Sequence, residues 1–413
     1  MSELRGACLI GQSGGPTSVI NSSAYGVIKT ALETGCITRV LAARHGIRGV
    51  LDDAIVDMGK EDPAELALFL NTPSSLIGSC RYKLKKADED DADYRRILEI
   101  FQKYEIRYFF YNGGNDSMDT CSKISEYMEH AGWECRVIGI PKTIDNDLVG
   151  TDHCPGFGSA ARYIATSVAE IVKDAAVYDK EMIVVIEMMG RHAGWLAAAA
   201  ALASVSGEGP AFVYLPEVTF DMETFFRDVD AYRKDHLHTV IAVSEGICDK
   251  DGRFVSEYGS DLAKSTDSFG HAQLGGLAAT LAQMLRDHTG AKVRGIELSL
   301  LQRCGAHCAS KTDIDEAFLA GKTAVEAAVS GVTGKMVAFA RPESGEYRCV
   351  TKLVDLAEVA NAEKTVPREW INEAGNGMLE AYFDYALPLI QGSPDYKTEN
   401  GLPRYPKLKF IHA

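Results

Sequence analysis

Short runs of β-branched and aromatic residues alternate with amphipathic segments along most of this chain. Such alternation is typical of a parallel β-sheet whose strands are joined by crossover helices. The pattern therefore predicts an α/β fold. About nine runs qualify as strands, which is more than one small sheet holds: Ala7–Gly11, Arg39–Arg44, Ile106–Tyr111, Arg136–Ile140, Met182–Glu187, Ala211–Leu215, Thr239–Val243, Val293–Leu298 and Lys335–Ala340.

Two amphipathic segments directly follow glycine-rich turns and are expected to be helices. Residues Asp116–Ala131 place apolar side chains at helical spacing, and Ser159–Ala175 does the same. The tail after Leu389 is punctuated by Gly and Pro and is expected to be irregular surface chain.

Length and composition describe a globular protein with more than one domain. At about 150 residues per domain, 413 residues correspond to two or three domains. Hydrophobic residues make up 46% and charged residues 24%, which excludes a disordered or fibrous chain.

The formal net charge of −15 limits the classes of partner. A surface of this sign repels nucleic-acid backbones and anionic lipid heads, so we expect neither a nucleic acid nor a membrane as partner. A local cluster of Arg and Lys can still reverse the field inside one cleft, so an anionic small substrate stays open.

The cysteine pattern and the apolar runs indicate the compartment. Ten cysteines are scattered without a C-x-x-C pair, which is typical of reduced thiols. The start of the sequence has no basic region followed by a long apolar core. The longest apolar run, around Ala197–Ala203, is far short of the ~18 residues of a membrane span. We therefore expect a soluble, cytoplasmic protein.

Unusual residues gather just after the predicted strands, at the carboxyl ends where open α/β sheets bind ligands. The first strand runs into the turn Gly11-Gln12-Ser13-Gly14-Gly15-Pro16-Thr17. Exposed N–H groups ahead of a helix suit an anion. The turn has neither the Walker lysine nor a G-x-G-x-x-G pattern, so by itself it leaves phosphate binding and a plain turn equally open.

Two further clusters bring carboxylates and an ammonium group to the same edge. Gly113-Gly114-Asn115-Asp116-Ser117 follows one strand, although Asp and Ser also cap helices, so a plain strand-to-helix turn stays open. Pro141-Lys142-Thr143-Ile144-Asp145-Asn146-Asp147 follows the next strand. Asp145 and Asp147 can serve as a base and a metal ligand, while Lys142 and Thr143 can hold phosphoryl oxygens.

The last two clusters offer cationic side chains. Met189-Gly190-Arg191-His192-Ala193-Gly194-Trp195 places an Arg and a His at a helix start. His192 fits equally well a residue that shapes a cleft and one that makes a single structural hydrogen bond. Arg294 and Arg303 bracket a strand and can grip a phosphate as bidentate charges.

In combination these motifs resemble those of the phosphofructokinases and, within that family, the pyrophosphate-dependent members. GGNDS, PKTIDND, MGRHAGW and Gln302-Arg303 occur in the family's order, within a resemblance that covers roughly Gly6 to Ala317. The resemblance implies two Rossmann-like parallel-sheet domains facing each other across a cleft. A domain of residues 1–155 plus about 304–355 would hold the phosphoryl donor with Mg²⁺. A domain of about 156–303 plus the C-terminal segment would hold fructose 6-phosphate.

The resemblance also implies roles for single residues. Asp145 is similar to the general base that takes the proton from the sugar 1-hydroxyl, and Thr143 and Asp147 would orient the transferred phosphoryl group and support the metal. On the phosphoryl-donor side, the matching residues are Lys142, Gly11, Gly14, Gly15, Arg81, Asp116 and Ser117. On the sugar side, they are Thr143, Met189, Gly190, Arg191, Glu245, Arg294 and Arg303.

Two residues bear on the choice of phosphoryl donor. ATP-using members of the family usually carry Gly at the positions of Asp116 and Lys142. A carboxylate at Asp116 would repel a nucleotide's α-phosphate, and Lys142 would place positive charge near a compact pyrophosphate. The resemblance thus implies reversible phosphoryl transfer from pyrophosphate to fructose 6-phosphate, serving glycolysis and gluconeogenesis.

Three departures from the family pattern bear on the metal and the sugar. Asn115 stands where the family usually has a metal-linked Asp, so Asp116 is expected nearer the metal, although the carbonyl oxygen of Asn115 can still coordinate. Leu300 replaces a His or Tyr, and Met182 replaces an arginine that reaches across a subunit interface, for which Lys180 is a candidate substitute. These losses leave room for another acceptor, such as sedoheptulose 7-phosphate.

Two alternative functions stay open beside this one. The first is an ATP-dependent 6-phosphofructokinase, and the second is a non-catalytic regulatory subunit that binds a sugar phosphate. A nicotinamide dehydrogenase is disfavoured because the chain lacks G-x-G-x-x-G with an acidic ribose partner. The family's assemblies imply a homodimer or a homotetramer.

Overall fold

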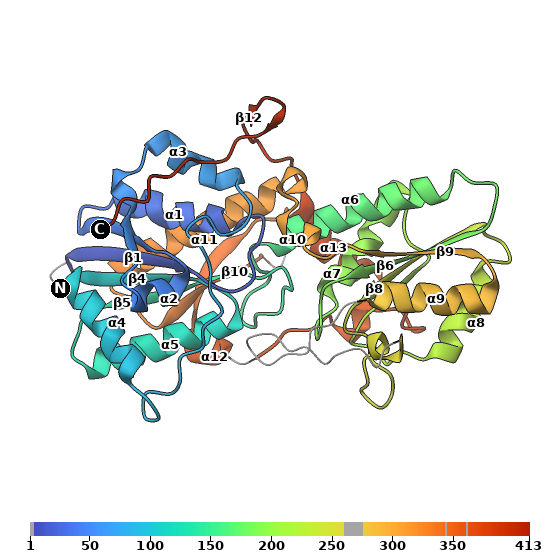
Figure 1. The fold of residues 1–413 in the computed structure, drawn as a ribbon, viewed down its shortest axis with the longest axis horizontal. Coiled ribbons are helices and arrows are strands. Elements are labelled where there is room, and N and C mark those ends of the chain that lie inside the picture. Colours follow the sequence, from blue (N-terminus) through green and yellow to red (C-terminus); the bar gives the residue numbers. More distant parts are fainter. Residues whose placement is uncertain (1–3, 260–275, 343–344, 361) are drawn as a thin grey trace.

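The computed structural model describes residues 4–259, 276–342, 345–360 and 362–413. These residues form two open sheets, each sandwiched between helices, and Figure 1 shows the two resulting parts lying side by side along the longest axis. The predicted α/β class is confirmed. Among the described residues, no helix combines the length and the apolar character needed to cross a membrane.

The larger part is built on a seven-stranded sheet with the order β11-β10-β5-β4-β1-β2-β3. Its five central strands are parallel, and the two edge strands pair antiparallel with their neighbours. In that order the strands are Val350–Asp355, Lys335–Ala340, Arg136–Pro141, Ile106–Gly113, Gly6–Gln12, Ile37–Ala43 and Ile55–Asp57.

Helices cover both faces of this sheet because its central strands are apolar on both sides. Helices α1 (Ile20–Leu32) and α11 (Lys311–Val329) pack on one face. On the other face lie α2 (Gly46–Leu51), α4 (Ala92–Lys103) and α5 (Asn115–His130). The carboxyl ends of β1, β4 and β5 thereby meet at one edge.

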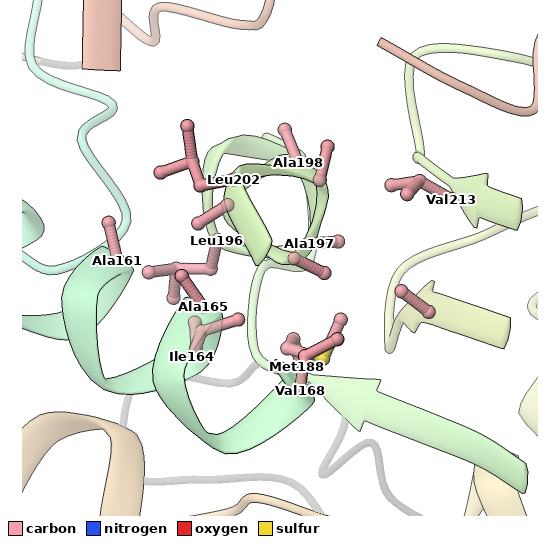
Figure 2. Close-up of a cluster of buried hydrophobic side chains, with 14 of the residues drawn as sticks. Ala161, Ile164, Ala165, Val168, Met188, Leu196, Ala197, Ala198, Leu202 and Val213 are labelled. Carbon is pink, nitrogen blue, oxygen red and sulfur yellow. The ribbon is translucent and has the colours of Figure 1, made fainter. Parts of the chain in front are cut away.

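The smaller part is built on a four-stranded parallel sheet with the order β7-β8-β6-β9. In that order the strands are Phe212–Tyr214, His238–Ser244, Met182–Met188 and Lys292–Glu297. Helices α6 (Phe157–Ala175) and α7 (Trp195–Ala199) pack on one face, and α8 (Met222–Tyr232) and α9 (Leu277–Thr289) on the other. Figure 2 shows small side chains such as Ala161, Ala165 and Ala197 where α6 and α7 meet, so the two helices approach closely.

The chain passes between the two parts more than once. After β9, helix α11 and strand β10 belong to the larger part, and helix α13 (Glu380–Ala386) then packs into the core of the smaller part. The roles of the two parts, one for the phosphoryl donor and one for the sugar, stay predictions.

All of the predicted strands are present, with ends that differ by at most two residues. The predicted irregular tail is wrong in one place, because β12 (Thr398–Glu399) and β13 (Leu402–Pro403) form a small antiparallel ladder. The intervening Asn400 and Gly401 have φ of 52° and 81°, the left-handed conformations that a two-residue hairpin turn requires. All ten cysteines are free thiols, as expected.

Candidate active site

A cavity of about 690 Å³ lies at the carboxyl ends of β1, β4 and β5, where an open α/β sheet binds its ligand. The turns after these strands supply most of its wall. Met189, which follows β6 of the smaller part, and Arg303, from the short helix α10 (Leu301–Cys304), complete it. The predicted residues that line it are Gly14, Gly15, Arg81, Asn115, Asp116, Ser117, Lys142, Thr143, Asp145, Asp147, Met189 and Arg303.

The loop after β5 turns two carboxylates toward this cavity. Asn146, between them, has φ of 56° and a fully buried side chain, whereas Asp145 and Asp147 line the cavity. The backbone N–H of Asp145 donates to the hydroxyl of Thr143 at 3.0 Å, which closes the turn. The loop thus holds both acids on one side.

The pKa of the Asp145 carboxyl group lies well above its ordinary value. Removal from bulk water raises its pKa to about 7, the negative charges of Asp147 and Glu245 act in the same direction, and Lys142 and Arg303 oppose them. Burial also raises the pKa of Asp147. A base whose pKa lies near the working pH is an efficient proton acceptor.

Lys142 is a buried ammonium group at the base of the cavity. Its Nζ donates to the carbonyl oxygen of Gly15 at 2.5 Å, which ties the end of β5 to the turn after β1. Burial lowers its pKa to about 8, against the opposing pull of Asp145 and Asp147. A Cβ on Gly14 would lie 3.3 Å from Nζ, and Gly14 has φ of 75°, so glycine fits this position on both counts.

Arg81 and Arg303 bring two guanidinium groups to the same cavity. Burial lowers the pKa of Arg303, and the charge of Arg81 adds to that effect. A Cβ on Gly15 would lie 3.1 Å from Nη1 of Arg303, so the glycine lets the guanidinium approach the turn. Two cations that repel each other across an open cavity favour an anion between them.

Charges of both signs line the cavity. Its carboxylates are Asp116, Asp145, Asp147 and Glu363, and its cations are Arg81, Lys83, Lys142 and Arg303. Lys83 lies 3.7 Å from Asp116, whose side chain is 42% exposed. The cations suit phosphoryl oxygens, and the carboxylates suit a metal ion or a proton.

The acidic wall also fits a divalent cation. Asp116 and Asp147 offer carboxylate oxygens, the hard ligands that Mg²⁺ and similar ions prefer. Beside them, Asn115 donates from Nδ2 to the carbonyl oxygen of Ala362 at 2.7 Å, and this bond fixes the orientation of the amide. The residues present therefore match a hard metal rather than a soft one.

Several predicted sugar-side residues gather beside this cavity without lining it. The N–H of Gly190 donates to Glu245 at 3.2 Å, and Gly190 has φ of 127°. Burial raises the pKa of Glu245, while the Gly190 hydrogen bond and Arg191 oppose the rise. Gly190, Arg191 and Glu245 thus form one cluster at the carboxyl ends of β6 and β8.

Two predicted site residues lie elsewhere. Gly11 is buried inside β1, where a Cβ would meet the Tyr111 ring at 2.8 Å, so its absent side chain serves packing. Arg294 is the third residue of β9 rather than a residue after its end, and it lines a separate cavity of about 330 Å³ with Tyr163 and Glu170. The sequence pattern marks the strands but does not tell whether either residue reaches the cavity at the carboxyl ends of the sheet.

Sequence reasoning missed Glu363, which lines the main cavity from a segment of residues 362–366, here called the strap. Glu363 forms a backbone bridge with Leu148, and the N–H of Lys364 donates to the carbonyl oxygen of Asp147 at 2.7 Å. The Glu363 carboxylate lies 3.1 Å from Nδ1 of His192. No glycine-rich turn or strand end marks the strap in the sequence, so no local signal pointed to it.

A carboxyl group with a pKa near neutral, beside clustered cations and oxygen ligands that suit a hard metal, fits a phosphotransferase. Comparison with known proteins agrees. A family model described as Phosphofructokinase matches residues 7–328. The chain therefore belongs to the phosphofructokinase family.

Relatives and solved structures match over nearly the whole chain. The pyrophosphate–fructose 6-phosphate 1-phosphotransferase of Methylococcus capsulatus is 46% identical over 401 residues, which are 96% of this chain and 94% of that protein. The enzyme of the same name from Halomonas elongata is 45% identical over 402 residues, again 96% and 94%. The crystal structure of a pyrophosphate-dependent phosphofructokinase from Nitrosospira multiformis matches with a TM-score of 0.89 and 39% identity, covering 98% of this chain and 97% of that one.

Proposed function

We propose that this phosphotransferase moves a phosphoryl group reversibly between pyrophosphate and the 1-hydroxyl of fructose 6-phosphate, giving fructose 1,6-bisphosphate and phosphate. One observation carries the proposal. Asp145, with a pKa near 7, and Lys142, with a pKa near 8, share one cavity, so an ionised base and a charged ammonium group coexist at neutral pH. The names of relatives at 44–46% identity support the same activity.

The geometry of Lys142 and Asp116 supports pyrophosphate as phosphoryl donor. Lys142 is held against Gly15, beneath a turn whose N–H groups suit phosphate oxygens. Asp116 lies on the cavity wall beside Lys83, where its negative charge would repel the additional phosphate of a nucleotide. A short, highly charged donor fits between them.

In the forward direction, Asp145 accepts the proton of the sugar 1-hydroxyl as that oxygen attacks the phosphorus. Lys142, Arg81 and Thr143 hold the phosphoryl oxygens while charge spreads over them, so positioning and electrostatic stabilisation supply most of the catalysis. In the reverse direction Asp145 starts protonated and returns the proton to the sugar oxygen.

Mg²⁺ is the metal that we assign to this site. Asp116 and Asp147, with Asn115 as a further oxygen donor, would hold it. When bound, the ion neutralises negative charge on the phosphoryl oxygens.

On the sugar side, Arg303 and Met189 line the cavity and are the residues that we assign to the sugar phosphate. Glu245, Gly190 and Arg191 lie beside these residues, and we assign them to the sugar hydroxyls of the bound acceptor. Arg294 lines a separate cavity, so we do not assign it to the sugar phosphate within a single subunit.

The domain assignment follows from this division of roles. We assign residues 1–155 and about 304–355 to the phosphoryl donor and about 156–303 to the sugar. Of the C-terminal segment expected on the sugar side, α13 packs into the smaller part, whereas the last residues pair with β3 of the larger part, where the N–H of Asp57 donates to the carbonyl oxygen of Ile411 at 2.9 Å. We further propose a cytoplasmic homodimer or homotetramer. Leu300 and Leu301, 54% and 57% exposed just after β9, offer an apolar surface for such a contact, and light scattering would test it.

The decisive experiment compares pyrophosphate with ATP as donor for fructose 6-phosphate in the presence of Mg²⁺, using the wild type and Asp145→Ala. We expect turnover with pyrophosphate, none with ATP, and a loss of at least about a thousandfold in kcat for Asp145→Ala. Preference for ATP would refute the assigned roles of Asp116 and Lys142. Turnover with neither donor would favour a regulatory sugar-phosphate-binding subunit or another acceptor.

A further inference from the structure

Asn146 lies within the loop that follows β5 and carries Asp145 and Asp147, here called the catalytic loop (residues 142–152). It lies between Asp145 and Asp147, its side chain is fully buried, and its φ of 56° is a conformation that Asn tolerates better than most residues. Its Oδ1 accepts from the N–H of Cys154 at 2.9 Å, and its Nδ2 donates to the hydroxyl of Tyr385 at 2.8 Å. The side chain points away from the cavity, and the two flanking acids line it.

Tyr385 comes from α13, far along the chain and beyond residue 328, where the family match ends. Its hydroxyl accepts from Asn146 and donates to the carbonyl oxygen of Asp152 at 2.8 Å, so one oxygen joins both ends of the loop segment 146–152. The Arg341 guanidinium also connects the two residues. It donates to the backbone carbonyl oxygen of Tyr385 at 3.1 Å and to the carboxylate of Asp152 at 2.8 Å.

The ring of Tyr385 packs within a cluster of aromatic side chains. It packs with its centroid 5.2 Å from that of Trp195 and 5.3 Å from that of Trp370. Trp195 itself begins α7, directly after the MGRHAG motif of the sugar side. An aromatic cluster in the core of the smaller part thus presents one hydroxyl group to the catalytic loop of the larger part.

We propose that Tyr385 is a positioning residue for the phosphoryl-transfer reaction and acts through Asn146 to hold Asp145 and Asp147 toward the cavity. This inference rests on the proposed function, because its readout is the rate of that reaction. Loss of the hydroxyl leaves the Asn146 amide and the Asp152 carbonyl without this partner in a buried place, so the loop relaxes toward other hydrogen bonds. A displacement of the base by about 1 Å can lower turnover a hundredfold.

Tyr382 provides a matched control on the same helix. It is buried, as Tyr385 is, with exposed fractions of 0% and 8%, and its hydroxyl donates to the carbonyl oxygen of Trp195 at 3.0 Å rather than to a residue of the loop. Tyr385→Phe and Tyr382→Phe therefore each remove one buried, hydrogen-bonded hydroxyl group from α13. Only the first touches Asn146.

The test measures kcat and the KM values for pyrophosphate and fructose 6-phosphate in each variant. We expect Tyr385→Phe to lower kcat about tenfold or more with each KM changed less than about threefold. Tyr382→Phe should stay within about twofold of the wild type in kcat and in each KM.

Asn146→Gly separates the hydrogen bonds from the backbone conformation, since glycine keeps the positive φ and lacks the side chain. We expect it to match Tyr385→Phe, and the double variant to be no slower than either single one, as for two residues that act as a unit. Equal kcat values for Tyr385→Phe and Tyr382→Phe, or additive losses in the double variant, would overturn the positioning role. An inactive wild type would overturn the proposed function and this inference with it.

Discussion

Nζ of Lys142 lies 2.5 Å from the carbonyl oxygen of Gly15, and this contact brings the end of one strand against the turn that follows another. The two residues are 127 positions apart in the chain, and both line the cavity. The ammonium group is thereby part of the cavity floor rather than a mobile surface charge.

Lys142→Met keeps the length of the side chain and removes its charge. We expect kcat with pyrophosphate to fall about a hundredfold or more, because a preorganised phosphoryl contact is lost in a water-poor site. Steady-state rates measure the effect. Lys83→Met is the control, since Lys83 is 60% exposed and ion-paired with Asp116, and a fall as large as that of Lys142→Met would contradict the special role of the buried ammonium.

The pH dependence of kcat/KM in the forward direction should be bell-shaped. Asp145 must be ionised to accept a proton, so the rate rises with pH through about 7, and Lys142 must be charged, so the rate falls above about 8. With fructose 1,6-bisphosphate and phosphate as substrates, Asp145 must start protonated, so the optimum moves to lower pH. Identical profiles in the two directions would exclude Asp145 as the group that exchanges the proton.

Asp145→Asn should make the protein more stable at pH 8 than the wild type. The folded pKa of Asp145 is raised above its unfolded value, so its favourable contribution is complete below about pH 4 and is lost as the pH rises through about 7. Thermal unfolding should therefore show a Tm gain of a few degrees at pH 8 that shrinks at pH 5. A Tm gain of equal size at pH 5 and pH 8 would contradict the explanation.

Asp116→Asn should raise the Mg²⁺ concentration needed for half-maximal rate about tenfold, because one hard, charged ligand is replaced by a neutral one. Titration of the rate with Mg²⁺ at saturating substrates measures the change. The matched variant Asp119→Asn alters a carboxylate on the same helix that pairs with Lys123 at 2.7 Å and lies outside the cavity lining. An unchanged requirement in Asp116→Asn would remove this residue from the metal site.

The strands and much of the cavity could be predicted from the sequence because both rest on local patterns. β-branched runs mark β1, β4 and β5, and the chemistry-bearing turns follow them directly, so the carboxyl-edge rule places Lys142 and Asp145 together. The rule does not apply to Arg294, because this residue lies within its strand rather than after the strand's carboxyl end.

Glu363 and Tyr385 could not be predicted in the same way. Each reaches the catalytic loop by tertiary packing from a segment without a sequence motif, and no periodicity reports which distant segment folds over a loop. The small hairpin at Asn400 and Gly401, in contrast, does have a local signal, because an Asn-Gly pair is typical of a two-residue hairpin turn.

The contact between Tyr385 and Asn146 has a consequence for synthesis of the chain on the ribosome. Every motif of the catalytic cavity has been translated by residue 303, yet the hydroxyl that joins the two ends of the catalytic loop is added more than eighty residues later. A nascent or truncated chain that ends before α13 would carry the complete set of signature motifs and still lack the support of that loop. Full activity would then report that synthesis and folding have passed α13.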